Sequence, residues 1–285
     1  MDTYVLVADC PERIGIVRAI SEFIYSLGAT ILDASQFTDL ENQRFFARWV
    51  FAPVDDQALP DVGALREQFS PIADGLSMKW EISDGNVKPR ILVAVSKFGH
   101  CLNDMLNRWH EDELPGEIVG VVSNHEKFRD KVEWYGLPFF YLPVDPDNRW
   151  GQEKEILDIM GREQIDLLVL ARYMQILSDK MCERIEGRAI NIHHSFLPGF
   201  KGAKPYHQAF DRGVKVIGAT AHYVTKDLDE GPIIEQDVQR VEHYYDGEAL
   251  ARLGQNVETV VLAKAVWWHC QHRVIINDKK TVVFK

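Results

Sequence analysis

Residues 91–95 read Ile-Leu-Val-Ala-Val, and the same apolar character returns at Ile118–Val122 and Leu167–Ala171. These runs lack the polar alternation of a half-exposed strand, so they predict strands buried on both faces of a parallel sheet. Amphipathic helical spacing separates them, around Leu102–Trp109 and over Glu153–Gly161. This succession predicts a Rossmann-like, mostly parallel α/β domain over residues 85–285.

Outward from this core, the same patterns predict the remaining elements of the second domain. They are a helix near Phe128–Tyr135, strands at Phe139–Leu142 and Ala189–His193, an antiparallel pair Val216–Val224 and Ile233–Val241, and a long helix over roughly Glu248–His272.

Residues 1–84 have a different pattern of apolar and polar residues, which predicts a small ferredoxin-like domain of order βαββαβ. The first helical pattern stops at Gly28, a residue suited to a helix C-cap. Ser83–Asn86 has the composition of a turn and is expected to link the two domains. The expected strands are Tyr4–Ala8, Thr30–Thr38, Arg44–Ala52 and Leu76–Ile82, and the expected helices are Ile16–Leu27 and Leu65–Ala73.

Charge is divided unevenly between the two predicted domains. The 285 residues carry a formal net charge of −11, and a surface of that sign repels a phosphate backbone, which disfavours nucleic acid as a partner. Residues 1–85 contribute −8 and residues 86–285 contribute −3, whereas all ten histidines follow residue 99. This division predicts chemistry in the second domain and a different role for the first.

The sequence also predicts a cytoplasmic protein. It opens without the basic segment and the long apolar segment of a secretory signal. Its apolar stretches stay shorter than the roughly 18 residues that predict a membrane helix. The four cysteines, at positions 10, 101, 182 and 270, lack the C-x-x-C spacing of zinc and redox motifs.

The segment Asn-Ile-His-His-Ser-Phe-Leu-Pro-Gly, residues 191–199, holds the first candidate catalytic residues. If the preceding strand ends at His193, the period of two places Asn191 and His193 on one face. Open α/β sheets bind ligands at this carboxyl end, and an amide and a protonated imidazole can both donate to a carbonyl oxygen that gains charge. By spacing alone, a strand end whose polar residues only cap backbone groups is the commoner interpretation.

Asp229 lies in the charged turn Thr225–Pro232, between the two strands of the predicted antiparallel pair. If this turn folds over the sheet edge, its carboxylate can orient His193, hold a water molecule and favour the charged form of the imidazole. An exposed loop aspartate is the simpler interpretation of the turn by itself.

Together these segments resemble the active-site signature of the folate-dependent formyltransferases. The N-x-H…D set of that family falls on Asn191, His193 and Asp229. Ala171–Ser178 is similar to its pterin-binding segment, and Gly218–Val224 resembles its strand before the aspartate loop. The resemblance implies that these three residues are catalytic and that the substrate is 10-formyltetrahydrofolate.

The resemblance also implies where the folate binds. Lys97, Arg172, Lys201 and Lys204 are basic candidates for its carboxylated tail. The residues expected to contact the folate are Met174, Ile176, Leu177, His222, Lys226, Asp227, Leu228 and Glu230.

Departures from the family pattern concern the acceptor side of the site. Ribonucleotide formyltransferases hold the acceptor phosphate on a Gly-rich loop, whereas residues 96–104 contain one glycine and the bulky Phe98. With His100 and Cys101, Phe98 marks an altered acceptor subsite, and His194 stands where those transferases usually carry proline. Water then becomes the acceptor. This implies hydrolysis to tetrahydrofolate and formate, which would supply formate for purine synthesis and balance the one-carbon folate pool.

Two other functions stay open: formyl transfer to a small amine, and an amino-acid sensor with an inactive catalytic domain. A metal site among His193, His194 and His222 is disfavoured because adjacent strand residues point to opposite faces. A thiol nucleophile at Cys101 is disfavoured because it and His100 should point apart on a helix. We therefore expect no metal and no permanently bound cofactor.

Residues 1–84 resemble an ACT domain, an amino-acid-sensing module of the same βαββαβ order. This implies a small amino-acid effector at the loop that holds Asp9, Arg13 and Gly15, and a homo-oligomer formed by pairing of edge strands. A purely structural dimerisation unit is the alternative. The expected partners are thus a folate, water, the effector and a second copy of the chain, with neither nucleic acid nor membrane.

Overall fold

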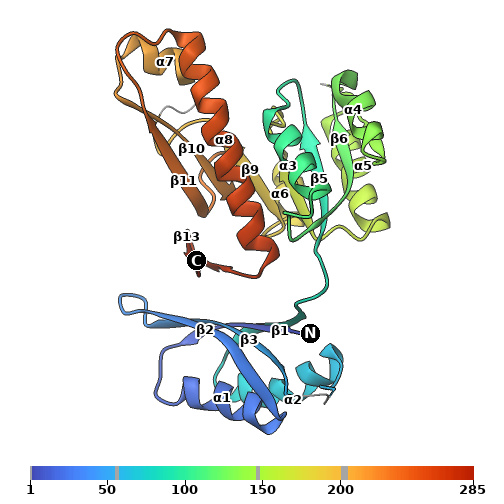
Figure 1. Ribbon diagram of the computed structural model, residues 1–285, viewed down its shortest axis with the longest axis vertical. Helices are drawn as coiled ribbons and strands as arrows, with labels where there is room; N and C mark the ends of the chain where they lie inside the picture. The colour runs from blue at the N-terminus through green and yellow to red at the C-terminus, as the bar shows by residue number, and fades with distance from the viewer. Residues whose placement is uncertain (1, 55–57, 146–147, 200–204) are drawn as a thin grey trace. The chain divides into compact units, whose positions relative to one another are not determined.

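The computed structural model describes residues 2–54, 58–145, 148–199 and 205–285, which form two compact units (Figure 1). One unit contains the chain up to Lys88 together with residues 271–277 and 282–285, and the other contains residues 89–270 and 278–281. The first is built on an antiparallel sheet and the second on a mostly parallel sheet. The predicted fold class, a small ferredoxin-like domain joined to a Rossmann-like one, is confirmed.

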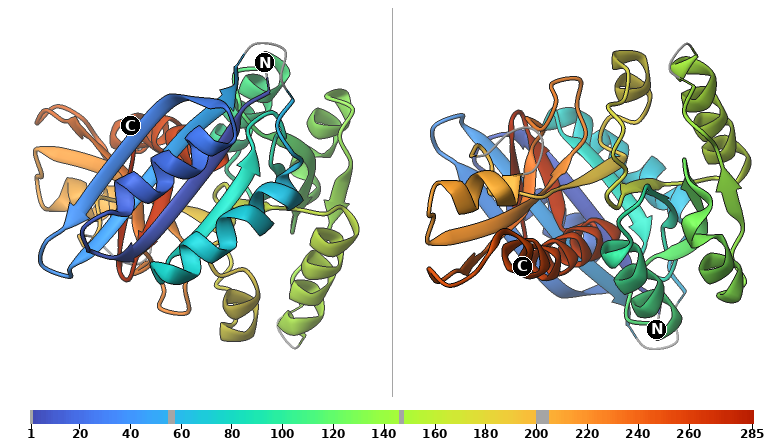
Figure 2. Two further views of the ribbon diagram at one scale, coloured as in Figure 1. Left: turned by 90° about the horizontal axis from the view of Figure 1, so that it is seen from below. Right: turned by 90° about the horizontal axis from the view of Figure 1, so that it is seen from above.

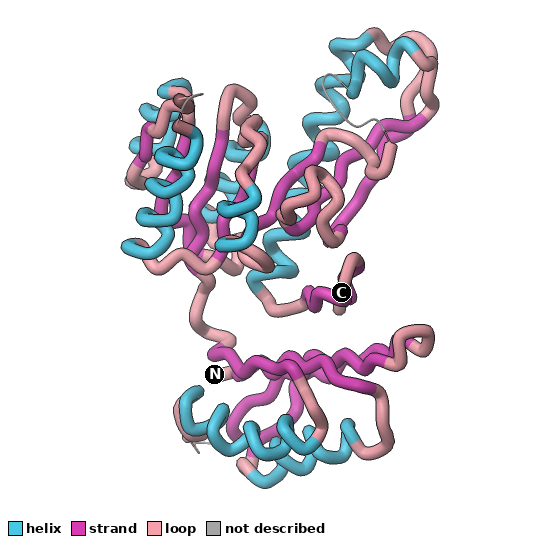
Figure 3. Tube along the Cα trace, turned by 180° about the vertical axis from the view of Figure 1, so that it is seen from behind, coloured by secondary structure: helices cyan, strands magenta, loops and turns pink. Residues whose placement is uncertain are grey.

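The first unit is a four-stranded antiparallel sheet with two helices on one face (Figure 3). The strand order β2-β3-β1-β4 puts the most apolar strands in the centre, and the rings of Phe23 and Phe69 from the two helices meet at 4.9 Å between centroids. The elements are β1 (Tyr4–Pro11), α1 (Ile16–Ser26), β2 (Ala29–Asp39), β3 (Arg44–Pro53), α2 (Val62–Gly75) and β4 (Lys79–Asp84).

The opposite face of this sheet carries the end of the chain. β12 (Val274–Asn277) and β13 (Lys280–Val283) form a hairpin, and Ile275 and Phe284 pack against Phe46 of β3. The sequence analysis placed all of residues 85–285 in the second domain and predicted no strands here. Four-residue strands in a polar tail give too short a pattern to be recognised.

The second unit holds a seven-stranded sheet of order β11-β10-β9-β8-β5-β6-β7. β7, β6, β5, β8 and β9 are mutually parallel, whereas β10 is antiparallel to both of its neighbours. In the two views of Figure 2 the parallel strands run from teal to yellow, and the edge strands β10 and β11 are orange. The strands are β5 (Arg90–Val95), β6 (Glu117–Ser123), β7 (Phe139–Tyr141), β8 (Leu167–Leu170), β9 (Ala189–His193), β10 (Val216–Tyr223) and β11 (Ile233–Arg240).

Helices cover this sheet, and the longest of them, α8, packs on β9, β10 and β11 (Figure 1). Two short helices, α6 and α7, were not predicted, because six or seven residues contain too little of the helical period to reveal it. The described helices include none with the length and apolar content needed to cross a membrane. The helical elements are α3 (His100–His110), η1 (Glu126–Phe128), α4 (Arg129–Trp134), α5 (Arg149–Arg162), α6 (Asp179–Arg184), α7 (Pro205–Asp211) and α8 (Gly247–Cys270).

Strand register brings three chain segments to one edge of the parallel sheet. Leu170 of β8 is paired with Ala94 of β5 on one side and with Asn191 of β9 on the other. Two residues further along each strand, Ser96, Arg172 and His193 follow at the carboxyl edge, where the backbone N–H of Ser96 donates to the carbonyl of Arg172 at 3.2 Å. Ligands of open α/β sheets bind at this edge.

Candidate active site

A cavity of about 790 Å³ lies at this carboxyl edge. Its wall contains residues from the segment after β8, the end of β9, the turn after β10 and one face of α8. The three predicted catalytic residues, Asn191, His193 and Asp229, are all part of it. Residues separated by up to 38 positions in the chain are therefore brought to one concave surface.

His193, which is buried, and Asp229, which is partly buried, are in contact in this wall. Nδ1 of His193 lies 3.2 Å from Oδ2 of Asp229, and since a carboxylate only accepts hydrogen bonds, Nδ1 carries a proton. Burial would raise the pKa of Asp229, but interactions led by the hydrogen bond from His193 outweigh it and hold this pKa well below its usual value. The other ring nitrogen of His193, Nε2, is buried without a hydrogen-bond partner among the described residues.

The turn that carries Asp229 is tightly folded. Asp229 itself has a φ of 57°, a left-handed conformation that aspartate and asparagine tolerate better than most residues. Gly231 packs so closely on the carbonyl of Tyr223 that any side chain would collide with it. The carbonyl of Asp227 accepts hydrogen bonds from the Thr225 hydroxyl (3.1 Å) and from the backbone N–H of residue 230 (3.2 Å). The turn thus holds the carboxylate over the sheet edge.

Asn191 is oriented by His222 on the neighbouring strand. Nδ1 of His222 lies 2.9 Å from the carbonyl of Tyr223 and donates to it, which leaves Nε2 as the ring nitrogen that can accept. The Asn191 amide nitrogen lies 3.2 Å from that Nε2 and donates to it. An amide has two N–H groups, so the second one is left for a ligand.

The predicted pterin-binding segment is held by a small hydrogen-bond network at its start. The Ser96 hydroxyl donates to Oδ1 of Asn124 at 2.7 Å and accepts from the backbone N–H of Met174 at 3.1 Å. Met174 and Ile176 remain about half exposed at the cavity, as does Leu228 across from them. Exposed apolar side chains beside a cavity suit a flat aromatic ligand.

The predicted folate contacts are placed in two groups. Asp227 and Glu230 are exposed residues of the turn around Asp229 and are not among the residues that line the cavity. The predicted residues that do line it are Met174, Ile176, Leu177, His222, Lys226 and Leu228.

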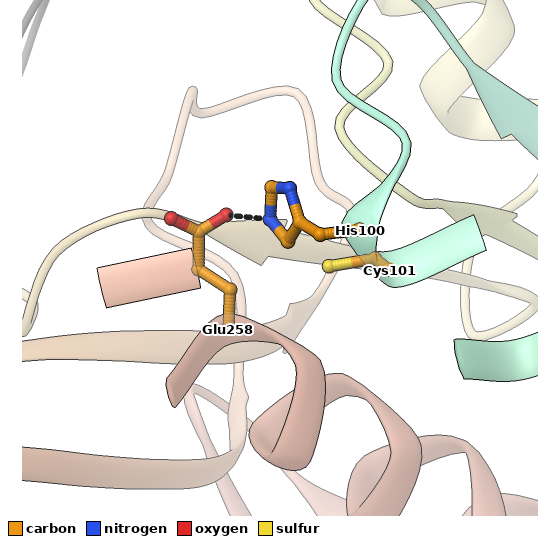
Figure 4. Close-up of side chains that lie close together, drawn as sticks. All are labelled: His100, Cys101 and Glu258. Atoms are coloured by element: carbon orange, nitrogen blue, oxygen red, sulfur yellow. Dashed lines mark hydrogen bonds and ion pairs between the residues drawn. The ribbon is translucent and has the colours of Figure 1, made fainter. Parts of the chain in front are cut away.

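Next to the predicted acceptor subsite lies a buried carboxylate, Glu258 of α8, at the centre of a polar cluster. Oε2 of Glu258 lies 2.7 Å from Nε2 of His100 and 3.4 Å from Nε of Arg172, and Oε1 accepts from the Tyr206 hydroxyl at 2.6 Å. Figure 4 shows His100 reaching from α3 to Glu258, with Cys101 beside it. Burial alone would raise the pKa of Glu258, but these partners outweigh it and lower its pKa, so the carboxylate is ionised.

His100, Cys101 and Glu258 also form a possible metal-ligand set, because one ligand atom of each lies within 4.8 Å of the others. The expectation that His100 and Cys101 point apart is wrong, since both lie in the first turn of α3, which faces α8. The chemistry of the set disfavours a cation, because burial raises the pKa of the Cys101 thiol well above its ordinary value and Arg172 already neutralises Glu258.

His194 also departs from the expected alternation. It was predicted to point away from His193, but the two ring centroids are 5.2 Å apart and both residues line the cavity. β9 ends at His193, so the period of two does not extend to the next residue. Burial and the charge of Arg172 lower the pKa of His194 to about 4, which makes it a neutral group at pH 7.

The sequence analysis did not relate three residues of this cluster to one another: Arg172, Tyr206 and Glu258. Arg172 was a candidate for the folate tail, yet it is 7% exposed and lies beside Glu258. Glu258 had a usable signal, because it interrupts the apolar stripe of α8 formed by Gly254, Val261 and other buried residues. A charge on a buried stripe needs a partner. Of the other tail candidates, Lys97 is exposed, and Lys201 and Lys204 lie outside the described residues.

In the first unit, the predicted effector loop is tied to neighbouring strands and helices. Asp9 forms an ion pair with Arg44, and the Arg13 guanidinium donates weakly to the carbonyl of Gly75 at 3.4 Å. Gly15 has a φ of 97° and precedes α1, a conformation that favours glycine. Arg13 and Gly15 lie in the loop between β1 and α1, whereas Asp9, expected in the same turn, is paired within β1, which continues to Pro11.

Comparison with known proteins gives two concordant results. The sequence model of the formyl transferase family matches residues 89–266. The formyltetrahydrofolate deformylase of Corynebacterium sp. (strain P-1) is 46% identical over 282 residues, which span 99% of this chain and 98% of that protein.

Solved structures agree with the sequence comparison. The crystal structure of a formyltetrahydrofolate deformylase from Pseudomonas syringae pv. tomato str. DC3000 matches with a TM-score of 0.96 at 48% identity, covering 100% of this chain and 95% of the other. Glycinamide ribonucleotide transformylase 1 from Symbiobacterium toebii matches with a TM-score of 0.65 at 28% identity, covering 70% of this chain and 95% of its own. Likeness to the deformylase thus spans the whole chain, whereas likeness to the transformylase spans seven tenths of it.

Proposed function

The chain belongs to the formyl transferase family, and from its full-length likeness to formyltetrahydrofolate deformylases we infer that it hydrolyses 10-formyltetrahydrofolate to tetrahydrofolate and formate. The structural observation that carries this function is the contact of buried His193 with Asp229 next to an Nε2 that has no partner. It supplies both a carboxylate for a water molecule and a donor for an oxyanion.

The geometry supports a role for each of three side chains. Asp229 stays ionised, accepts from His193 and is placed to orient the attacking water. The protonated imidazole of His193 donates through Nε2 to the formyl oxygen as it becomes an oxyanion. Asn191, with one N–H held by His222, donates its second N–H to the same oxygen. Donors fixed in advance need little rearrangement when charge develops.

The reaction balances with water as the only co-substrate. The water oxygen forms a bond to the formyl carbon, and the bond from that carbon to N10 breaks. One proton of the water goes to N10, and the other leaves when formic acid ionises to formate. His193 and Asp229 are placed to move these protons between the oxyanion, the water and the leaving nitrogen.

The acceptor side of the cavity supports water over an amine. Phe98 lines it, and behind Phe98 lies the cluster of Glu258, Arg172 and His100. Bulky and charged side chains in this part of the wall favour a small acceptor such as water. The two alternatives, transfer to a small amine and an inactive sensor, are not favoured, because the relatives that span the whole chain are deformylases.

The test is an assay of formate release from 10-formyltetrahydrofolate without any acceptor. We expect stoichiometric formate and tetrahydrofolate from the purified protein, at a rate that is unchanged by dialysis against a chelator. A rate that requires an added amine would indicate a transferase instead. Loss of activity on chelation, restored by a metal, would overturn the expectation that the enzyme needs no metal and no permanently bound cofactor.

We further propose that the first unit binds a small amino acid at the loop of Asp9, Arg13 and Gly15, and that its edge strand pairs with a second copy of the chain.

The four cysteines are free and buried, which supports a reducing compartment such as the cytoplasm. Formate released there would be available to purine synthesis. Neither nucleic acid nor a membrane is expected as a partner.

The effector proposal predicts that one amino acid changes the rate of formate release. Arg13→Gln should abolish that response and leave the basal rate unchanged, because Arg13 belongs to the first unit and only its weak bond to Gly75 is lost. The measurement is the rate with each of the twenty amino acids added in turn. Identical rates with all twenty would contradict the proposal.

A further inference from the structure

Arg172 has an unusual environment for a buried cation. It is 7% exposed, and its Nε and Nη1 have no hydrogen-bond partner among the described residues. Its contact with Glu258 is an ion pair of 3.4 Å without the geometry of a hydrogen bond. A guanidinium carries five N–H donors, and leaving buried charged donors unpaired is costly. The free N–H groups of Arg172 can therefore donate to a hydrogen-bond acceptor that arrives with the substrate or is formed from it.

The backbone of Arg172 is also adapted to this placement. Its φ of 64° is left-handed, an uncommon conformation for a long side chain. Hydrogen bonding of its carbonyl to Ser96 fixes the segment on one side. On the other side, the last paired residues of β8 and β9 are Leu170 and Asn191, so Arg172 and His193 each follow two residues later at the carboxyl edge. Both residues line the cavity, so the guanidinium shares this space with the catalytic residues.

The surroundings restrict the ligand to a small planar anion. The Cζ atom of Arg172 lies 5.2 Å from the centroid of the Phe98 ring, which covers it on one side. Glu258 closes another side, and neutral His194 adds no competing charge. Planar carboxylates match the fork of a guanidinium with two parallel hydrogen bonds. The reaction proposed above makes one such anion, formate, at this place.

We propose that Arg172 forms the subsite that receives formate when the bond from the formyl carbon to N10 breaks. This rests on the proposed hydrolysis. In the tetrahedral intermediate, one oxygen faces His193 and the other comes from water; after the bond breaks, both become the carboxylate oxygens that Arg172 binds. Glu258 is the positioning residue that anchors Arg172 and prevents it from reaching the catalytic Asp229.

The carboxylates of the folate tail share this chemistry, but the structure favours formate. A tail with charged carboxylates belongs at the exposed mouth of the cavity, near Lys226, whereas Arg172 is buried against α8. The two sources predict different outcomes when Arg172 is changed, because formate and the folate can be titrated separately.

The test is the affinity of full-length protein for [13C]formate, measured by NMR line broadening. Arg172→Met should raise the Kd for formate at least tenfold, and Arg172→Lys should raise it severalfold because a lysine keeps the charge but lacks the fork. Arg162→Gln, which changes an exposed arginine of α5, should leave it at the wild-type value. An unchanged Kd in the Arg172 variants, or no formate binding by the wild type, overturns the proposal. If Arg172→Met does not fold, Arg172→Lys decides alone.

Two further measurements distinguish a failure of the formate subsite from a failure of the proposed hydrolysis. If Arg172→Met weakens the binding of tetrahydrofolate but not of a tail-less pterin, and leaves the formate Kd unchanged, Arg172 serves the folate tail and the formate subsite is refuted. Formate binding is measured without turnover. A wild type that binds formate through Arg172 but releases none from 10-formyltetrahydrofolate would therefore refute the hydrolase function and leave the subsite supported.

Discussion

Asp229→Asn is expected to lower the rate of formate release by about 10²–10³, which corresponds to roughly 3–4 kcal/mol of lost transition-state stabilisation. The amide lacks the negative charge that the carboxylate places beside His193, and it presents only one oxygen where the carboxylate presents two. His193, which lies 3.2 Å from Oδ2 of Asp229, then competes with the attacking water for that single acceptor. The measurement is kcat from formate release at saturating folate.

This substitution separates chemistry from folding. Asparagine tolerates the left-handed φ of 57° at position 229 as well as aspartate does, so the turn should keep its shape. Asp237→Asn, an exposed position on β11, is the matched control and should keep the wild-type rate. Near-normal turnover by Asp229→Asn, with the folate KM unchanged, would remove Asp229 from the mechanism.

His193→Ala, alone and combined with Asp229→Asn, tests whether the two residues act together. Because His193 and Asp229 act as a unit, the double variant should be little slower than the slower single variant. Full additivity of the two effects would instead mean that each residue acts on the reaction independently. The 3.2 Å contact would then be structural only.

How far the sequence predicts this molecule depends on the length of each pattern. The buried strand Ile91–Val95 and the long helix α8 were recognisable because each contains several repeats of its period. β9 was predicted with the bounds the structure has, Ala189–His193. α6 was not, because its start depends on one hydrogen bond, from the backbone N–H of Met181 to the Ser178 hydroxyl at 3.2 Å, rather than on a repeated pattern.

The residues of the site also fall into two groups: those related by a short sequence pattern and those brought together only by the fold. Asn191 and His193 are two residues apart on one strand, so the period of the strand relates them. The contact of His193 with Asp229 depends on the fold of a turn 36 positions away, so the sequence offered it only as one of two interpretations until the family resemblance favoured it. The cluster of Glu258, Arg172 and Tyr206 joins three elements far apart in the chain. Pairwise contacts of this kind leave no periodic trace in a sequence.

Glu258→Gln tests that cluster and should lower the stability of the second unit by about 3–5 kcal/mol, since it leaves the buried cation of Arg172 without its counter-charge. Glutamine is similar in size and can still accept from Tyr206, so most of the loss reflects charge. For a unit of this size we expect the thermal midpoint to fall by roughly 6–20 °C. Glu248→Gln, on the exposed face of the same helix, is the matched control and should leave the midpoint unchanged.

Adding Arg172→Met to Glu258→Gln should restore most of the lost stability, because replacing both members of a buried ion pair is often close to neutral. A double variant that is less stable than either single variant would show that packing, and not charge, dominates at this position. The packing is tight here, since Tyr206 lies against Gly254, one turn before Glu258, where any side chain would collide with its ring.

The ion pair of Glu258 with Arg172 also gives the stability of the fold a predictable pH dependence. The pKa of Glu258 in the folded protein lies below its ordinary value of 4.5. A carboxyl of this kind stabilises the fold fully at pH values above its unfolded pKa, and the stabilisation is lost as the pH falls through the folded-state pKa. The difference in thermal midpoint between the wild type and Glu258→Gln should therefore be complete at pH 7 and shrink below about pH 4.5. A difference that stays constant down to the acid-unfolding limit would mean that the ionised carboxylate of Glu258 does not stabilise the fold.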